Sequence, residues 1–137
     1  MRDLVIITDI PIRFDDVSEK IKKAFKKCTY YNFDSTSIYL QNRRARVYIE
    51  FLGQAKLTDP INMMDETIDR VPNKDAFLTN LYYSTAEIAK KVIGLIKDDF
   101  GNMWIQSDEY DDWFGTADEF IRDYKINRDD IKNANLK

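Results

Sequence analysis

Residues 98–124 hold the densest group of chemically active side chains in this 137-residue sequence. Nine carboxylates and seven aromatic rings occur there with a single base, Arg122, so the segment has a formal charge of −8 while the whole chain has −3. The carboxylates are Asp98, Asp99, Asp108, Glu109, Asp111, Asp112, Asp118, Glu119 and Asp123. The remaining residues must therefore sum to +5. Such a separation of charge predicts a negative surface that attracts a cationic partner from a distance.

The middle of this segment is predicted to be a partner-binding surface. Its residues are Asp108, Glu109, Tyr110, Asp111, Asp112, Trp113 and Asp118. The carboxylates would bind cationic groups, and Tyr110 or Trp113 would supply contact area, because aromatic side chains are enriched in interface hot spots. The alternative is a solvated loop in which Trp113 and Phe114 anchor the chain in the core.

The same carboxylates could instead bind a metal ion or act as an acid and a base. A calcium loop that begins at Asp108 has Asp112 at its fifth position, but it has Tyr110 at its third and Trp113 at its sixth, where an EF-hand requires glycine. Acid–base catalysis needs one desolvated carboxyl, whereas these carboxyls have charged and polar neighbours. We therefore expect no enzymatic activity, no metal and no cofactor, and keep a carboxylate-based metal-dependent enzyme as an alternative.

The chain has no histidine and one cysteine, Cys28. Catalytic triads based on imidazole and zinc sites that contain histidine are therefore excluded. No internal disulfide can form, and the apolar run near the amino terminus is too short for a signal peptide core. No apolar run is long enough to cross a bilayer. These features predict a cytoplasmic protein that does not enter a membrane.

Basic side chains form a second group. Lysines cover the outer face of the first predicted helix, and Arg43, Arg44 and Arg46 follow a predicted strand that contains Tyr39. Arginines beside Tyr39 and Tyr48 could bind nucleic acid through phosphate contacts and stacking. A lysine-coated helix is more often simply solvated, and a pI near 5.0 is unusual for a dedicated nucleic-acid binder. We therefore expect no direct nucleic-acid binding.

Hydrophobic periodicity predicts an α+β fold in a single domain, residues 1–137, with the last few residues frayed. Strands are predicted at 4–10, 30–40, 46–52, 77–83 and 103–105, with a hairpin turn near 42–43. Helices are predicted after Asp16, after Ser84 and after Thr116, and each of these residues has a glutamate three positions later, as in a capping box. Residues 53–76 are expected to be a long connection with a short helical turn near 63–68. The order favours a mainly antiparallel sheet with helices on one face and a partly ferredoxin-like arrangement.

Residues 80–124 resemble the closing half of several small immunity proteins, which protect bacteria from polymorphic or contact-dependent toxins. The resemblance lies in the run 81–84 (Leu-Tyr-Tyr-Ser) before a capped helix, in the run 100–105 (Phe-Gly-Asn-Met-Trp-Ile), in Asp108 and in the run 118–120 (Asp-Glu-Phe). It implies a non-enzymatic inhibitor that binds a cognate toxin domain, commonly a nuclease, and it offers no catalytic residues. The acidic surface adds the expectation that this toxin domain is basic. A regulatory module that binds another basic protein is the alternative, and the sequence leaves the oligomeric state open.

Overall fold

A computed structural model describes residues 2–27, 29–34, 36–42, 45–58, 63–107 and 112–125, with the backbone alone at 29–34 and 42. The strands are β1 (Arg2–Thr8), β2 (Thr29–Asp34), β3 (Ser37–Asn42), β4 (Ala45–Lys56), β5 (Asp75–Tyr83), β6 (Met103–Ser107) and β7 (Trp113–Thr116). The helices are α1 (Phe14–Ala24), α2 (Asp65–Arg70), α3 (Ala86–Ile96) and α4 (Ala117–Asp123). The strands form one antiparallel sheet in the order β2-β3-β4-β5-β1-β6-β7, which confirms the α+β prediction.

The middle of the sheet has the arrangement of a ferredoxin-like fold. Strands β1 and β5, which precede α1 and α3, lie side by side, and the outer strands β4 and β6 follow those helices. This interleaving of two strand–helix–strand units is the split βαβ pattern. Strands β3 and β2 extend the sheet beyond β4, and β7 extends it beyond β6.

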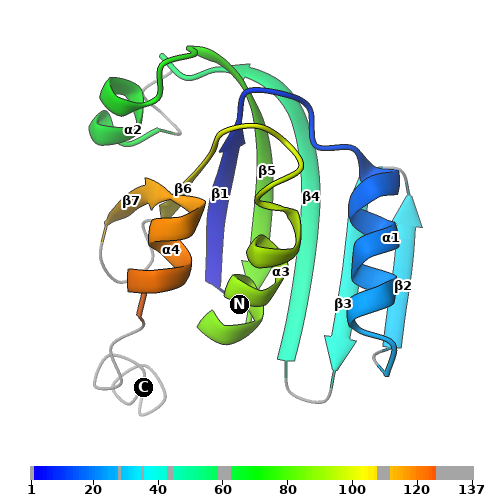
Figure 1. Ribbon diagram of the computed structural model, residues 1–137. Coiled ribbons are helices and arrows are strands. Elements are labelled where there is room, and N and C mark those ends of the chain that lie inside the picture. Colours follow the sequence, from blue (N-terminus) through cyan, green and yellow to red (C-terminus); the bar gives the residue numbers. More distant parts are fainter. Residues whose placement is uncertain are drawn as a thin grey trace.

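The main core lies between the sheet and three helices. Figure 1 shows α1, α3 and α4 in front of the strands, with their axes running along them. Alternate residues of β1, β4 and β5 point toward these helices because successive side chains of a strand face opposite sides. The buried residues of these strands in this cluster are Leu4, Ile6, Val47, Ile49, Leu81 and Tyr83. Helix α3 supplies the complementary stripe of Ile88, Ala89, Val92, Ile93 and Ile96.

The other face of the sheet is covered by α2 over one part only. A smaller cluster there joins Ile7, Leu78 and Phe114 of the strands to Met63 and Val71, which flank α2. Gln106 of β6 fixes this helix, since its buried Oε1 accepts hydrogen bonds from the Met64 amide (2.9 Å) and the Thr67 hydroxyl (2.6 Å). The rest of that face has no described helix over it.

Two of the three predicted helix caps were wrong. Helix α1 begins at Phe14 after Arg13, which makes no side-chain capping bond, so Asp16 lies inside the first turn. Thr85 and not Ser84 caps α3, because its side chain accepts the Ile88 amide. The Ser84 hydroxyl accepts the amide of Arg46 instead and ties β4 to the end of β5. The capping box at Thr116 and Glu119 is confirmed.

The strand predictions missed two strands. The predicted strand 30–40 is two strands, β2 and β3, which pair with each other, and β7 was not predicted. β7 has four residues and follows a highly charged run of the sequence, so it gives little periodic signal. The long connection holds α2 as expected, but β4 extends into it as far as Lys56. Cys28, Arg43 of the turn predicted near 42–43, and the last residues with their predicted fraying lie outside the described residues.

Candidate functional site

The predicted acidic surface is divided among separate elements. Asp98 and Asp99 follow α3, Asp112 precedes β7, and Asp118, Glu119 and Asp123 lie on α4. The four residues of β7 separate Asp112 from α4. Four of the predicted contact residues, Asp108, Glu109, Tyr110 and Asp111, lie outside the described residues. The structure therefore places Asp112, Trp113 and Asp118 of the predicted site.

Lys97 joins two of the carboxylates at the carboxyl end of α3. Its Nζ lies 2.9 Å from Asp118 Oδ1 and 3.1 Å from Asp98 Oδ1. Both aspartates remain open to solvent, with side chains that are 80% (Asp98) and 78% (Asp118) exposed. Hydrogen bonds from the ammonium to Asp118 and then Asp98 raise the pKa of Lys97. One cation thus serves two carboxylates beside an open hollow of about 260 Å³, so a negative charge is left over.

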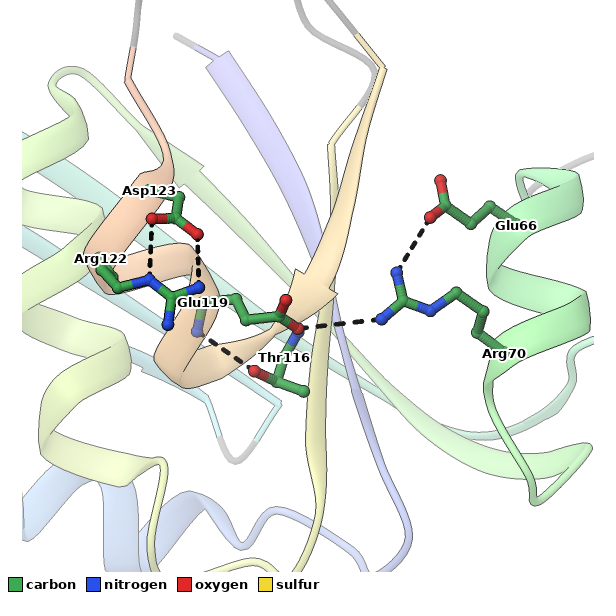
Figure 2. A network of polar contacts seen from close by, with 6 residues as sticks. All are labelled: Glu66, Arg70, Thr116, Glu119, Arg122 and Asp123. Atoms are coloured by element: carbon green, nitrogen blue, oxygen red, sulfur yellow. Dashed lines mark hydrogen bonds and ion pairs between the residues drawn. The ribbon is translucent and has the colours of Figure 1, made fainter.

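Glu119 works as a capping residue at the start of α4. Its carboxylate accepts the Thr116 amide at 2.9 Å, and its own amide donates to the Thr116 hydroxyl at 3.1 Å. The hydrogen bond from the Thr116 backbone is the main reason that the pKa of Glu119 lies below its ordinary value. Figure 2 shows this carboxylate between Thr116 and Arg70.

Arg70 brings α2 into contact with α4 and β7. Its guanidinium lies 3.9 Å from Glu119 and 3.0 Å from Glu66, and its Cζ lies 4.9 Å from the centre of the Phe114 ring. Two carboxylates again share one cation. The Arg70 contact to Glu119 ties the covering helix to the carboxyl-terminal helix, although its length indicates a weak ion pair.

Of the remaining described carboxylates in the segment, two form ion pairs and one does not. Asp99 pairs with Lys20 of α1, and Asp123 pairs with Arg122, whose guanidinium lowers the pKa of the Asp123 carboxyl. Within the described part of the segment, only the exposed Asp112 has no ion pair. The sequence suggested one block of negative charge, but the fold neutralises part of it with cations from α1, α2 and α3.

Trp113 packs against the main core. Its half-buried indole packs edge-on against Phe120 (5.5 Å between ring centroids) and Tyr124 (5.9 Å), next to the main cluster. Phe114 points to the opposite face of the sheet and is buried with Ile7 and Leu78. These are the anchoring roles of the alternative interpretation, in which the two aromatic residues fix the chain on either side of β7.

The structure assembles a second aromatic surface, of which the sequence prediction singled out only Tyr39 and Tyr48, beside the arginines. Tyr39, Tyr48 and Tyr82 are direct cross-strand neighbours on β3, β4 and β5, and Asp3 of β1 continues the row beside Tyr82. We call Tyr39, Tyr48, Tyr82, Asp3 and Glu50 the tyrosine face. The alternation of Val47 and Ile49 with Tyr48 and Glu50 signals that Tyr48 and Glu50 point away from the main core. Only the strand order shows that three tyrosines lie together.

In the ranges that the structure describes, no group of three or more cysteine, aspartate or glutamate side chains is placed to hold a metal ion. No described helix has the length and apolar character needed to cross a membrane.

Comparison with protein-family models, with curated proteins and with solved structures finds no match for this chain. The resemblance to immunity proteins therefore stays a prediction from the residues quoted above.

Proposed function

We propose that the protein is a non-enzymatic, cytoplasmic binding protein whose partner is basic, and that it is an immunity protein that inhibits a cognate bacterial toxin by direct binding. The observation that carries this proposal is the excess of exposed carboxylate around Lys97. Asp98 and Asp118 flank that single cation and are about four-fifths exposed. The Asp98 and Asp118 carboxylates and the adjoining hollow are accessible to cationic groups of a partner.

The excess charge has a specific consequence for association. Lys97 and Arg70 each serve two carboxylates, and Asp112 is exposed without an ion pair in the described chain. The local charge therefore stays negative after the internal pairs are counted. Charge of one sign on a binding surface accelerates encounter with a partner of opposite sign, and the effect falls as salt screens it.

A toxin that acts on nucleic acid would fit this chemistry. A nuclease holds a polyanion with lysine and arginine, so an inhibitor can occupy the same cleft with carboxylates placed like phosphates. The predicted contacts Asp108, Glu109, Tyr110 and Asp111 belong to the same proposal, together with Asp112 and Asp118.

The experiment has two parts. A toxin gene directly beside the gene for this chain supports the proposal, and its purified toxin domain is then the binding probe. Association rates are measured by stopped flow at 50 and 300 mM salt for the wild type and for a variant with Asp98→Asn, Asp112→Asn and Asp118→Asn. We expect at least a ten-fold slower association at low salt and a flatter salt dependence in the variant.

The matched control carries Asp15→Asn, Asp65→Asn and Glu87→Gln, which removes as many exposed carboxylates from the first turns of α1, α2 and α3. Circular dichroism confirms that both variants are folded. Equal loss of rate in both variants would show that only net charge matters and would reject this surface. Unchanged kinetics in the first variant would reject it too.

A further inference from the structure

The tyrosine face lies where the second side of the sheet has no described helix over it. Its row runs across four strands, with Asp3 opposite Tyr82, Tyr82 opposite Tyr48, and Tyr48 opposite Tyr39. The rings of Tyr48 and Tyr82 are 5.7 Å apart between centroids and tilted by 55°. All three tyrosines are half-buried, so they support one another while leaving ring surface exposed.

Two carboxylates on this face have no ion pair with a cation of the described residues. In the described part of the chain, neither Asp3 nor Glu50 takes part in an ion pair. Glu50 accepts a long hydrogen bond of 3.4 Å from the amide of Asn80, its cross-strand neighbour. Both carboxylates are half-buried. Partly desolvated negative charge without a cation beside it is unfavourable, and a cation supplied by another molecule would stabilise it.

The negative charge of these carboxylates reaches the tyrosine row. Burial raises the pKa of the Tyr82 hydroxyl, and Glu50 and then Asp3 add to the rise. Tyrosine rings attract cations through their faces, and nearby carboxylates strengthen that attraction. Among the described residues, the only base on the same side of β4 near the row is Arg46. It is exposed and lies opposite Gln41 of β3, at the end of the row away from Asp3.

We propose that the tyrosine face is a docking surface for a protein segment that carries arginine or lysine side chains. One cationic group would lie between Asp3 and Glu50, against Tyr82, and its neighbours would cover Tyr48 and Tyr39. This surface is separate from the one around Lys97, and the inference does not depend on the proposed function. It adds a second site with its own recognition chemistry.

Two other occupants fit the charges less well. Single-stranded RNA could stack on the tyrosines and reach Arg46, but its phosphates would be repelled by Asp3 and Glu50. If a second copy of the chain docked through the same face, it would bring the same two carboxylates. It would bring no excess of cations to complement them. Charge complementarity favours the basic protein segment.

The test is a titration of isotope-labelled full-length protein, followed by NMR of the tyrosine rings and the backbone. The probes are the peptide Gly-Arg-Gly-Arg-Gly-Arg-Gly, its counterpart with citrulline in place of arginine, and the RNA decamer of uridine. We expect the arginine peptide to shift the resonances of Tyr39, Tyr48 and Tyr82, and the citrulline peptide and the RNA to shift them little. Shifts confined to residues around Lys97, stronger binding of the RNA, or self-association on this face in sedimentation experiments would each overturn the proposal.

Variants separate recognition from folding. Glu50→Gln and Asp3→Asn keep the size of each side chain, and each should weaken the arginine peptide by about two- to five-fold, as expected for one partly exposed charge pair. Asp15→Asn is the matched control, because Asp15 is exposed on α1 and belongs to neither proposed surface, and it should leave binding to this face unchanged. Equal affinity of the wild type and the Glu50→Gln and Asp3→Asn double variant would overturn the proposal, and the amide spectrum of each variant shows whether the sheet has stayed intact.

Discussion

The surface around Lys97 and the tyrosine face both carry carboxylates, but they differ in whether cations of the described chain lie beside these carboxylates. In the carboxyl-terminal region, cations from three helices or their ends approach the carboxylates, as Lys20 does for Asp99 and Arg70 for Glu119. On the tyrosine face, Asp3 and Glu50 have no such cation in the described chain. The number of carboxylates in a sequence segment therefore overstates the charge it offers to a partner. Asp3 and Glu50 lie on a part of the sheet with no described helix over it, and no ion pair within the described residues neutralises them.

The aromatic side chains show the same contrast. Trp113, Phe120 and Tyr124 lie in the acidic segment, yet their rings pack on each other beside the main core. Tyr39, Tyr48 and Tyr82 of the sheet lie outside that segment, yet they keep ring surface exposed. Trp113, Phe120 and Tyr124 of the acidic segment are thus anchors, whereas the three tyrosines brought together across β3, β4 and β5 form a surface.

The largest expected effect tests Trp113 as an anchor. Replacing Trp113 by alanine removes the edge-on contacts with Phe120 and Tyr124 and leaves a cavity beside α4. We expect the free energy of unfolding to fall by about 3 kcal/mol. This is the lower end of the range of losses for replacing a core tryptophan by alanine, because the indole is half-buried. Urea denaturation measures the change. Wild-type stability combined with weaker partner binding would instead make Trp113 a contact residue.

The next effect concerns α2, the described helix that covers one part of the second face of the sheet. Gln106→Ala leaves the buried Thr67 hydroxyl and the Met64 amide without their acceptor. We expect a loss of about 2 kcal/mol, because a buried polar group without a partner costs its desolvation. Hydrogen exchange should accelerate at residues 65–70 while the β4 and β5 amides beside Tyr48 and Tyr82 stay protected. Equal acceleration in both places would show that the two parts of the face are not independent.

A smaller effect is expected at the cap of α4. Thr116→Ala removes the hydroxyl that accepts the Glu119 amide, and loss of such a cap costs about 1 kcal/mol. Thr116→Ser keeps the hydroxyl and should recover most of the stability in thermal denaturation. A Thr116→Ser variant as unstable as Thr116→Ala would assign the loss to the methyl group of threonine.

The smallest effect tests the charge of the capping residue Glu119 through the pH dependence of stability. The pKa of Glu119 is lowered in the folded protein, so its charge stabilises the fold above its ordinary value of 4.5, and this contribution is lost as pH falls through the lowered folded pKa. Wild type should therefore be slightly more stable than Glu119→Gln at pH 7, with the difference vanishing in acid. Denaturation curves from pH 7 to pH 2 measure it, with Glu87→Gln as the control. A difference that is independent of pH would contradict the role of the Glu119 charge.

The sequence alone determined the class of fold and several local features. The apolar stripe of α3, the alternation in β4 and the capping box at Thr116 are patterns of neighbouring residues, and short-range geometry is sufficient to predict them. Cap positions were less certain: at α3 the adjacent Ser84 and Thr85 are both suitable capping residues, and only their hydrogen bonds distinguish them.

Only the tertiary structure decided which charges meet. The contacts of Lys20 with Asp99 and of Arg70 with Glu119 join elements far apart in the chain, and no local periodicity encodes them. The row from Asp3 to Tyr39 depends on the order of four strands and on their register, since a shift of one residue would turn each side chain to the other face. Composition therefore predicted that this protein carries excess negative charge, while strand pairing and helix packing decided where that charge remains available.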